Sequence, residues 1–166
     1  GKSLAKDKEA SDELKKKKYD FVVGNPPYVR QEEVKNKPQL QKDFPEVYDG
    51  RADLFVYFVE LGIKLLDEKG SLSYITSNKF MKTGYGLGTR KFILDNTSIS
   101  QIIDFGDSQV FEDATNYPCI FVINKPKDPN QEISGVNVTD KALLKANELH
   151  EVLALIRNQR SNQVNQ

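Results

Sequence analysis

Apolar residues recur along this chain with two different periods, and each period predicts one kind of element. From Ala52 to Asp67 they return at three- and four-residue steps, which is typical of an amphipathic helix packed on a sheet. A second helix is expected over 89–95, after a glycine-rich loop at 84–88, and Gly70 is expected to end the first helix. Short apolar runs predict buried strands at 19–24, 72–76, 100–105 and 118–124, with an edge strand at 133–138. Because helices and strands alternate, the expected fold class is α/β with an open sheet.

The two ends of the chain differ in composition from its middle. Residues 1–18 are charged nearly throughout and predict a solvated helix. Residues 140–160 predict a helix with a leucine-rich face, followed by a disordered tail at 161–166. The domain is therefore expected to span 19–139, with an irregular or partly helical excursion at 31–50.

The composition is that of a globular protein. Of the 166 residues 38% are hydrophobic and 29% charged, and no apolar run approaches the ~20 residues that a membrane span needs. The single cysteine, Cys119, lies in an apolar run, which indicates a reduced core thiol rather than a nucleophile and fits a cytoplasmic protein. His150 has no second ligand at metal-binding spacing, so no metal site is expected.

The charge balance argues against a free-standing DNA-binding module. Lysine and arginine number 24, as do aspartate and glutamate, so the formal net charge is zero and lacks the usual basic excess. Any nucleic-acid function must therefore come from local chemistry. Arg30, Lys79, Lys82 and Arg90 are either phosphate contacts or ordinary surface charges.

A stiff tetrapeptide, Asn25, Pro26, Pro27 and Tyr28, follows directly on the predicted strand at 19–24. The two prolines fix φ and hold the residues before them extended. The tetrapeptide stands at the carboxyl end of a strand, where open α/β sheets bind ligands. Asn, Pro and aromatic residues also make ordinary turns, so the tetrapeptide alone leaves a structural turn and a catalytic loop open.

The same residues suit the chemistry of an exocyclic amine on a planar ring, whose lone pair is delocalised and poorly nucleophilic. If the Asn25 side-chain oxygen and the Pro26 carbonyl each accept one N–H, the lone pair turns toward an electrophile. This stabilisation grows as positive charge develops on the nitrogen. The Tyr28 ring would stack on the base and hold it.

A longer segment, DFVVGNPPYVRQE, resembles motif IV of γ-type amino-methyltransferases that modify adenine N6. RADLFVYFVELGIKLLDEKGSLSYITSNKF is similar to the next helix and strand of that family, and SQIIDFGDSQVF and NYPCIFVINK follow its remaining motifs in order. The resemblance covers roughly residues 19–125 and is closest to the methylase part of single-chain type IIG restriction-modification enzymes. It implies the C-terminal half of a Rossmann-like class I methyltransferase sheet, strands four to seven, with flanking helices. Whether an endonuclease is fused to the methylase stays open.

The resemblance also implies the reaction and its central residues. The reaction is methyl transfer from S-adenosylmethionine to N6 of a flipped-out adenine in double-stranded DNA. Asn25 and Pro26 would be the amine acceptors, Tyr28 the stacking ring, and Pro27 a neighbour of the bound base.

Four further residues receive less specific roles from the resemblance. Phe111 would be a second aromatic near the base, unless it packs in the core, and Tyr117 competes for that role. Asp53 and Leu54 would approach the cofactor, although helix capping and core packing explain them equally well.

The segments that hold most of the cofactor in such enzymes are not found in this sequence. A glycine-rich turn after a first strand and an acidic residue after a second are expected for S-adenosylmethionine, and the glycines at 84–88 are expected to form a loop instead. We therefore expect a fragment without the main cofactor loop, inactive alone, that meets DNA through the full-length protein. Its first strand, around Phe21, would be an exposed apolar edge through which the fragment self-associates.

Two other interpretations remain open. Related loops serve methyltransferases that act on a glutamine side chain of release factors or on an RNA base amine, because a carboxamide also presents an NH2 group. The excursion at 31–50 and the helix at 52–67 favour the DNA family. A non-catalytic module is the other alternative, and the intact Asn25, Pro26 and Tyr28 set argues against it.

Overall fold

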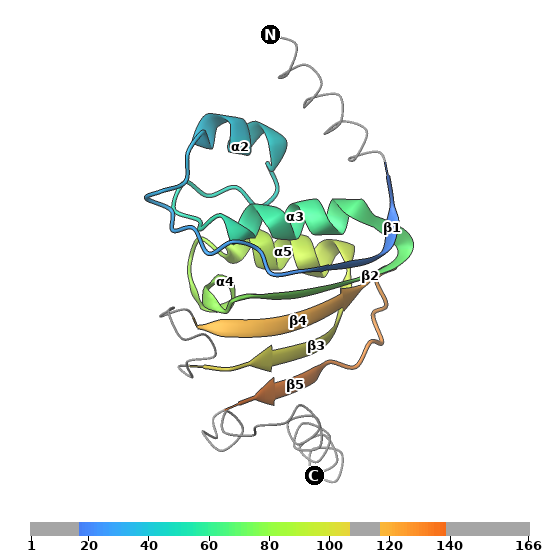
Figure 1. Ribbon diagram of the computed structural model, residues 1–166. Coiled ribbons are helices and arrows are strands. Elements are labelled where there is room, and N and C mark those ends of the chain that lie inside the picture. The colour runs from blue at the N-terminus through green and yellow to red at the C-terminus, as the bar shows by residue number, and fades with distance from the viewer. Residues whose placement is uncertain (1–16, 107–116, 139–166) are drawn as a thin grey trace.

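The computed structural model of this protein describes residues 17–106 and 117–138 (Figure 1). Predictions for the remaining residues, which include almost all of both terminal helices, the tail and Phe111, lie outside the described residues. The strands are β1 (Tyr19–Gly24), β2 (Leu66–Ser77), β3 (Ser98–Asp104), β4 (Pro118–Asn124) and β5 (Ser134–Asn137). The helices are α2 (Lys37–Asp43), α3 (Phe55–Leu65), α4 (Lys79–Lys82) and α5 (Leu87–Asn96). The predicted α/β class is confirmed.

The strands form one five-stranded sheet in the order β1-β2-β4-β3-β5. β1 is parallel to β2, and β3 is parallel to β5, whereas β4 is antiparallel to both of its neighbours. β2 and β3 therefore run in the same direction. The ends of β1, β2 and β3 and the start of β4 meet on one side of the sheet, on the left in Figure 1. We call this side the carboxyl edge.

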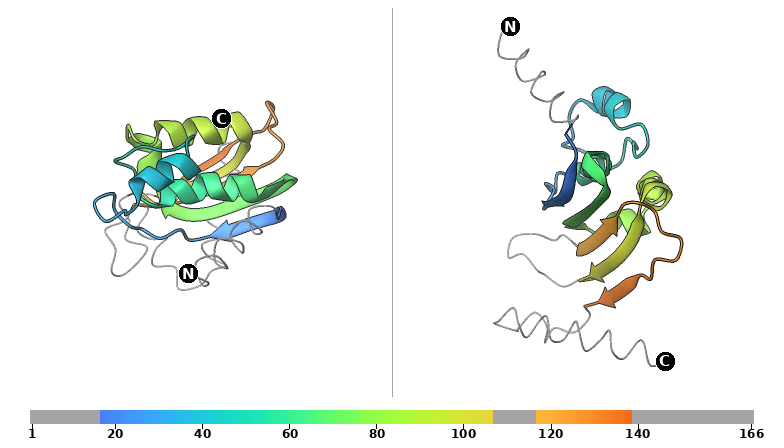
Figure 2. Two further views of the ribbon diagram at one scale, coloured as in Figure 1. Left: turned by 90° about the horizontal axis from the view of Figure 1, so that it is seen from above. Right: turned by 90° about the vertical axis from the view of Figure 1, so that its right-hand side faces the viewer.

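Helices α3 and α5 lie on the same face of the sheet (Figures 1 and 2). The core fills the space between them and the strands, because every second residue is buried from Gly70 to Thr76 of β2 and from Cys119 to Ile123 of β4. Burial of one large apolar side chain contributes roughly 1.5–3 kcal/mol. Core side chains from α3 and the two strands include Phe55, Val56, Tyr57, Val59, Ile63, Leu66, Leu72, Tyr74, Phe121 and Ile123.

The first long helix is shorter than its apolar pattern predicts. α3 ends at Leu65, and Leu66 is already extended and paired with Tyr19 of β1. The prediction that Gly70 ends the helix is wrong, because Gly70 lies inside β2. A Cβ on Gly70 would stand 2.8 Å from the Tyr19 carbonyl oxygen, and its own carbonyl accepts the amide of Lys125 at 2.9 Å. The close approach of a neighbouring strand is therefore what requires glycine here.

Other differences are small. α5 begins two residues before the predicted helix and β3 two residues before the predicted strand, and the short α4 was not predicted. The prediction that β1 is buried is wrong, since Phe21 is 76% and Val23 78% exposed. β1 pairs only with β2, which confirms the expected apolar edge around Phe21 within the described residues.

The glycines at 84–88 form the turn into α5, where two of them allow backbone segments to pack closely. A Cβ on Gly86 would lie 2.0 Å from the Phe80 carbonyl oxygen. A Cβ on Gly88 would lie 2.9 Å from the carbonyl oxygen of Glu46. Backbone packing accounts for both glycines without a ligand.

Replacing Gly86 with Ala is expected to lower the free energy of unfolding. The new Cβ would overlap backbone atoms that cannot rotate away, and such overpacking costs roughly 1–3 kcal/mol. Gly84→Ala is the matched control from the same turn, because a Cβ there meets nothing within 4 Å. Urea unfolding of the full-length protein measures both, and equal stability of the two variants would contradict the packing argument.

Candidate functional site

The Asn25–Tyr28 loop leaves β1 at the carboxyl edge, as the sequence predicts. Asn25 and Pro27 are exposed, whereas Pro26 is buried between them and Tyr28 is half-buried. An exposed amide side chain beside a buried, rigid backbone is available to a ligand without further movement of the chain. The two prolines supply this rigidity.

The exit of the loop is fastened to the start of α3. The Leu54 amide donates to the Val29 carbonyl at 2.9 Å, and the Gln31 amide donates to Asp53 Oδ1 at 3.0 Å. Asp53 does not cap α3: the N-cap residue is Leu54, which makes no side-chain cap bond, and the Asp53 carboxylate accepts from Gln31 and Tyr85 instead. Leu54 packs against the core. The structure thus brings both residues next to the loop, and their predicted cofactor contact stays a prediction.

The hydroxyl end of Tyr28 is buried close to Cys119. Burial, with a smaller effect of Cys119, raises the pKa of Tyr28 to about 12. Burial first, and then the charge of Asp104, raises the pKa of Cys119 to about 12. Both groups are neutral at physiological pH. Cys119 is free and buried, which confirms the predicted core thiol.

A polar cluster joins the other strand ends at the carboxyl edge. The Asn78 Nδ2 donates to Asp104 Oδ1 at 2.8 Å, and the Gly106 amide donates to the same oxygen at 3.0 Å. Lys82 Nζ lies 3.6 Å from Asp104 Oδ2. The Asn78 amide donates to the Tyr117 carbonyl at 2.7 Å, which ties β2 to the start of β4.

This cluster holds Tyr117, one of the predicted base contacts, at the edge with 42% of its surface exposed. The other predicted aromatic, Phe111, lies outside the described residues. Sequence reasoning missed Asn78 and Asp104. Both are polar residues at the ends of apolar strands, which is the signal that would have found them.

Of the four candidate phosphate contacts, two bind groups of this chain through their side chains. Arg90 Nη1 donates to the carbonyls of Phe80 and Thr83 at 2.6 and 2.9 Å, so its charge is directed to the backbone between α4 and α5. Lys82 is engaged by Asp104, although its side chain is 65% exposed. The other two are Lys79, the first residue of α4, which is half-buried, and Arg30, which is exposed beside the loop.

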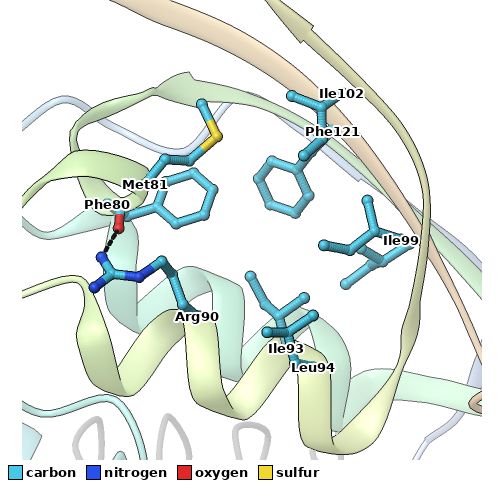
Figure 3. A pocket seen from close by; sticks show the side chains of 9 residues that line it. Phe80, Met81, Arg90, Ile93, Leu94, Ile99, Ile102 and Phe121 are labelled. Carbon is cyan, nitrogen blue, oxygen red and sulfur yellow. Dashed lines mark hydrogen bonds between the residues drawn. The ribbon is translucent and has the colours of Figure 1, made fainter. Parts of the chain in front are cut away.

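One apolar cavity near the helices does not contain the loop. It has a volume of about 230 Å³ and lies between α4, α5, β3 and β4 (Figure 3). Its only charged wall residue is Arg90, whose guanidinium faces the Phe80 carbonyl. Over residues 17–106 and 117–138 there is no group of His, Cys, Asp or Glu that would hold a metal ion. Within the same residues, no helix is long and apolar enough to cross a membrane.

The sequence pattern of the Eco57I restriction-modification methylase family matches residues 2–111, which include the loop, α3, β2 and β3. The chain belongs to this family. The predicted resemblance to a restriction-modification methylase is therefore confirmed.

Individual relatives agree with the family. The chain is 46% identical over 109 residues to the type II methyltransferase M.BstVI of Geobacillus stearothermophilus, which covers 64% of this chain and 19% of that protein. It is 34% identical over 117 residues to the type II restriction enzyme and methyltransferase RM.Eco57I of Escherichia coli, which covers 68% of this chain and 12% of that one. The chain thus spans less than a quarter of either relative.

Solved structures share the fold. A protein of Listeria monocytogenes described as a class I S-adenosylmethionine-dependent methyltransferase superposes with a TM-score of 0.59 at 21% identity, over 86% of this chain and 43% of that one. The type ISP restriction-modification enzyme LlaGI superposes with a TM-score of 0.60 at 16% identity, over 81% of this chain and 16% of that one. The predicted class I methyltransferase architecture, a mixed sheet with flanking helices, is confirmed.

Replacing Cys119 with Ala is expected to change how stability depends on pH. The thiol titrates at its ordinary pKa of 9.0 when unfolded and at about 12 when folded, so the stability linked to its protonation is complete below about pH 9 and is lost as pH rises toward 12. At about pH 10 the wild type should have lost roughly 1 kcal/mol relative to the variant.

Urea unfolding of the full-length proteins between about pH 8 and 10.5 measures the difference. The cavity left by the substitution lowers stability by an amount that does not depend on pH, so only the slope is diagnostic. Parallel pH profiles for wild type and Cys119→Ala would refute the buried neutral thiol.

Proposed function

We propose that the full-length protein carrying this chain methylates N6 of a flipped-out adenine in double-stranded DNA, as part of a restriction-modification system. One observation carries the proposal. Asn25 is exposed at the carboxyl edge, on a stiff loop whose exit is fastened to α3, in a chain that belongs to a restriction-modification methylase family. The relatives are named as a type II methyltransferase and as a combined type II restriction enzyme and methyltransferase, and these names favour a type II system. The type IIG assignment, with its endonuclease, is part of the proposal.

Asn25 and Pro26 would activate the amine. One N–H of the adenine amine donates to the Asn25 side-chain oxygen and the other to the Pro26 carbonyl, so that the nitrogen becomes pyramidal and its lone pair is no longer delocalised into the ring. When bound, S-adenosylmethionine supplies a methyl group that is electrophilic on its sulfonium, and the S–CH3 bond breaks as the N6–CH3 bond forms. Both hydrogen bonds strengthen as N6 becomes positive, and N6 then releases one proton to solvent.

Tyr28 would support the base through its ring. With a pKa of about 12 the phenol is neutral at physiological pH, and its ring offers an uncharged face for stacking. Pro27 beside it is exposed, and we propose that Pro27, Tyr117 and Phe111 complete the walls around the base. Tyr117 reaches the same edge because its carbonyl accepts the Asn78 amide.

The described residues fit S-adenosylmethionine only in part. They provide the carboxyl edge where such a ligand binds, with Asp53 and Leu54 near it, but Gly86 and Gly88 are used for backbone packing. We therefore propose that the principal cofactor loop belongs to another part of the full-length protein. This chain would then be inactive when it is expressed alone.

The partners follow from charge and from the exposed edge. With a net charge of zero, the chain supplies little of the phosphate grip, so we propose that DNA is held by other parts of the full-length protein. In the full-length protein, those other parts cover the exposed Phe21 and Val23 of β1. When the chain is expressed alone, a second copy covers them. Light scattering on the isolated chain distinguishes a monomer from such an association.

Replacing Asn25 with Ala is expected to abolish DNA methylation. Loss of one positioned hydrogen-bond acceptor lowers the rate by about 100- to 1000-fold. The test expresses the full-length gene in a host without DNA methylation and quantifies N6-methyladenine in host and plasmid DNA by mass spectrometry. Asn25→Asp is the matched control, since it keeps an acceptor oxygen and should retain more activity than Asn25→Ala.

The informative contrary result is a wild-type protein that folds and binds S-adenosylmethionine yet leaves adenine unmarked. The substrate would then be another NH2 group, such as a release-factor glutamine or an RNA base amine. If no labelled methyl group is transferred to cell extract either, the chain is a non-catalytic module.

Replacing Tyr28 separates the ring from its hydroxyl. Tyr28→Phe should retain activity, whereas Tyr28→Ala loses stacking worth about 1–3 kcal/mol per base, or roughly 5- to 150-fold in kcat/KM for a DNA duplex. Steady-state methylation of a duplex oligonucleotide measures both. A Tyr28→Phe variant as impaired as Tyr28→Ala would shift the role from the ring to the hydroxyl.

A further inference from the structure

Asp53 links the Asn25–Tyr28 loop to α3, which has more buried residues than any other described helix. Asp53 stands two residues before Phe55, the first residue of α3, and its carboxylate oxygens bind groups outside that helix. Asp53 Oδ1 accepts the amide of Gln31 at 3.0 Å. Gln31 stands only three residues beyond Tyr28, so this bond acts on the exit of the loop.

A second bond reinforces the first. The Leu54 amide donates to the Val29 carbonyl at 2.9 Å, so consecutive residues before α3 hold alternate residues of the loop exit. α3 itself is fixed by its core side chains, of which Phe55 is 1% and Val56 0% exposed. The position of the loop exit is therefore fixed relative to the core.

The other oxygen of the carboxylate is also engaged. Tyr85, from the turn before α5, donates its hydroxyl to Asp53 Oδ2 at 3.4 Å. Burial and, to a smaller extent, the charge of Asp53 raise the pKa of Tyr85 to about 12, so the hydroxyl remains a donor. Both carboxylate oxygens thus bind groups of this chain, and the backbone bond is the shorter of the two.

We infer that Asp53 is a positioning residue that holds the Asn25–Tyr28 loop through the Gln31 amide, and is not a ligand of the cofactor. The inference rests on the proposed function, because it concerns the placement of the same loop. It assigns Asp53 an effect on turnover: a reacting group misplaced by about 1 Å costs on the order of 100-fold in rate.

The two roles predict different responses to substitution. A positioning role needs an acceptor oxygen but no charge, so Asp53→Asn should keep kcat within about threefold of wild type. Asp53→Ala leaves the Gln31 amide without its acceptor and should lower kcat by roughly 10- to 100-fold. The dissociation constant for S-adenosylmethionine should change less than about twofold in both variants. A cofactor ligand would show the opposite: weaker cofactor binding in both variants with kcat preserved at saturation.

The experiment uses the full-length protein and three measurements on each variant. Calorimetry gives the dissociation constant for S-adenosylmethionine, steady-state methylation of a duplex gives kcat and KM, and 2-aminopurine at the target position reports the flipped base by fluorescence. Tyr85→Phe is the matched control, because it removes the longer bond to Asp53 and leaves the Gln31 bond intact; its kcat should stay within about threefold of wild type.

Each outcome decides the inference. A lower kcat in Asp53→Ala that Asp53→Asn rescues, with unchanged cofactor affinity, supports it. A tenfold loss of cofactor affinity in Asp53→Asn, or wild-type kcat in Asp53→Ala, overturns it. If Asp53→Ala does not fold, the cofactor affinity of the near-isosteric Asp53→Asn still decides against or for the ligand role. Undiminished methylation by Asn25→Ala would instead reject the proposed function itself.

Discussion

The burial of α3 against the sheet is the interaction on which the other parts of this structure depend. Its apolar face fills the core with Phe55, Val56, Val59 and Ile63, and its ends and flanks then act as fixed points for irregular backbone. At its start, Asp53 and Leu54 hold the exit of the Asn25–Tyr28 loop.

On the same helix, the fully buried Glu60 carboxylate accepts the Val47 amide at 3.1 Å and the Lys64 ammonium at 2.5 Å, and so fixes the excursion that precedes α3. A buried charge without such partners would be strongly destabilising. One helix therefore organises two loops that have little secondary structure of their own.

Local sequence decided some elements and left others open. β1 and β4 have the predicted bounds because a proline, which cannot continue a strand, stands two residues after the end of each apolar run: Pro26 after β1 and Pro126 after β4. The boundary between α3 and β2 was not predictable in this way, since consecutive leucines suit both a helix face and a buried strand. The position of the Asn25–Tyr28 loop at the carboxyl edge could be predicted because the loop follows a strand. The pairing of Asn78 with Asp104 could not, because it depends on β4 inserting antiparallel between β2 and β3.

The edge position of β1 explains why its loop needs a second anchor. β1 pairs on one side only, and Phe21 and Val23 on its outer face are largely exposed, so within the described residues the strand by itself constrains the loop weakly. Two prolines make the loop stiff, but stiffness fixes shape and not location. Location comes from the exit, where Val29 and Gln31 bind the residues ahead of α3. A rigid loop that is held by β1 at one end and by the start of α3 at the other can keep the Asn25 side chain in one place. A fixed position is what a group needs to stabilise the charge that develops in the transition state.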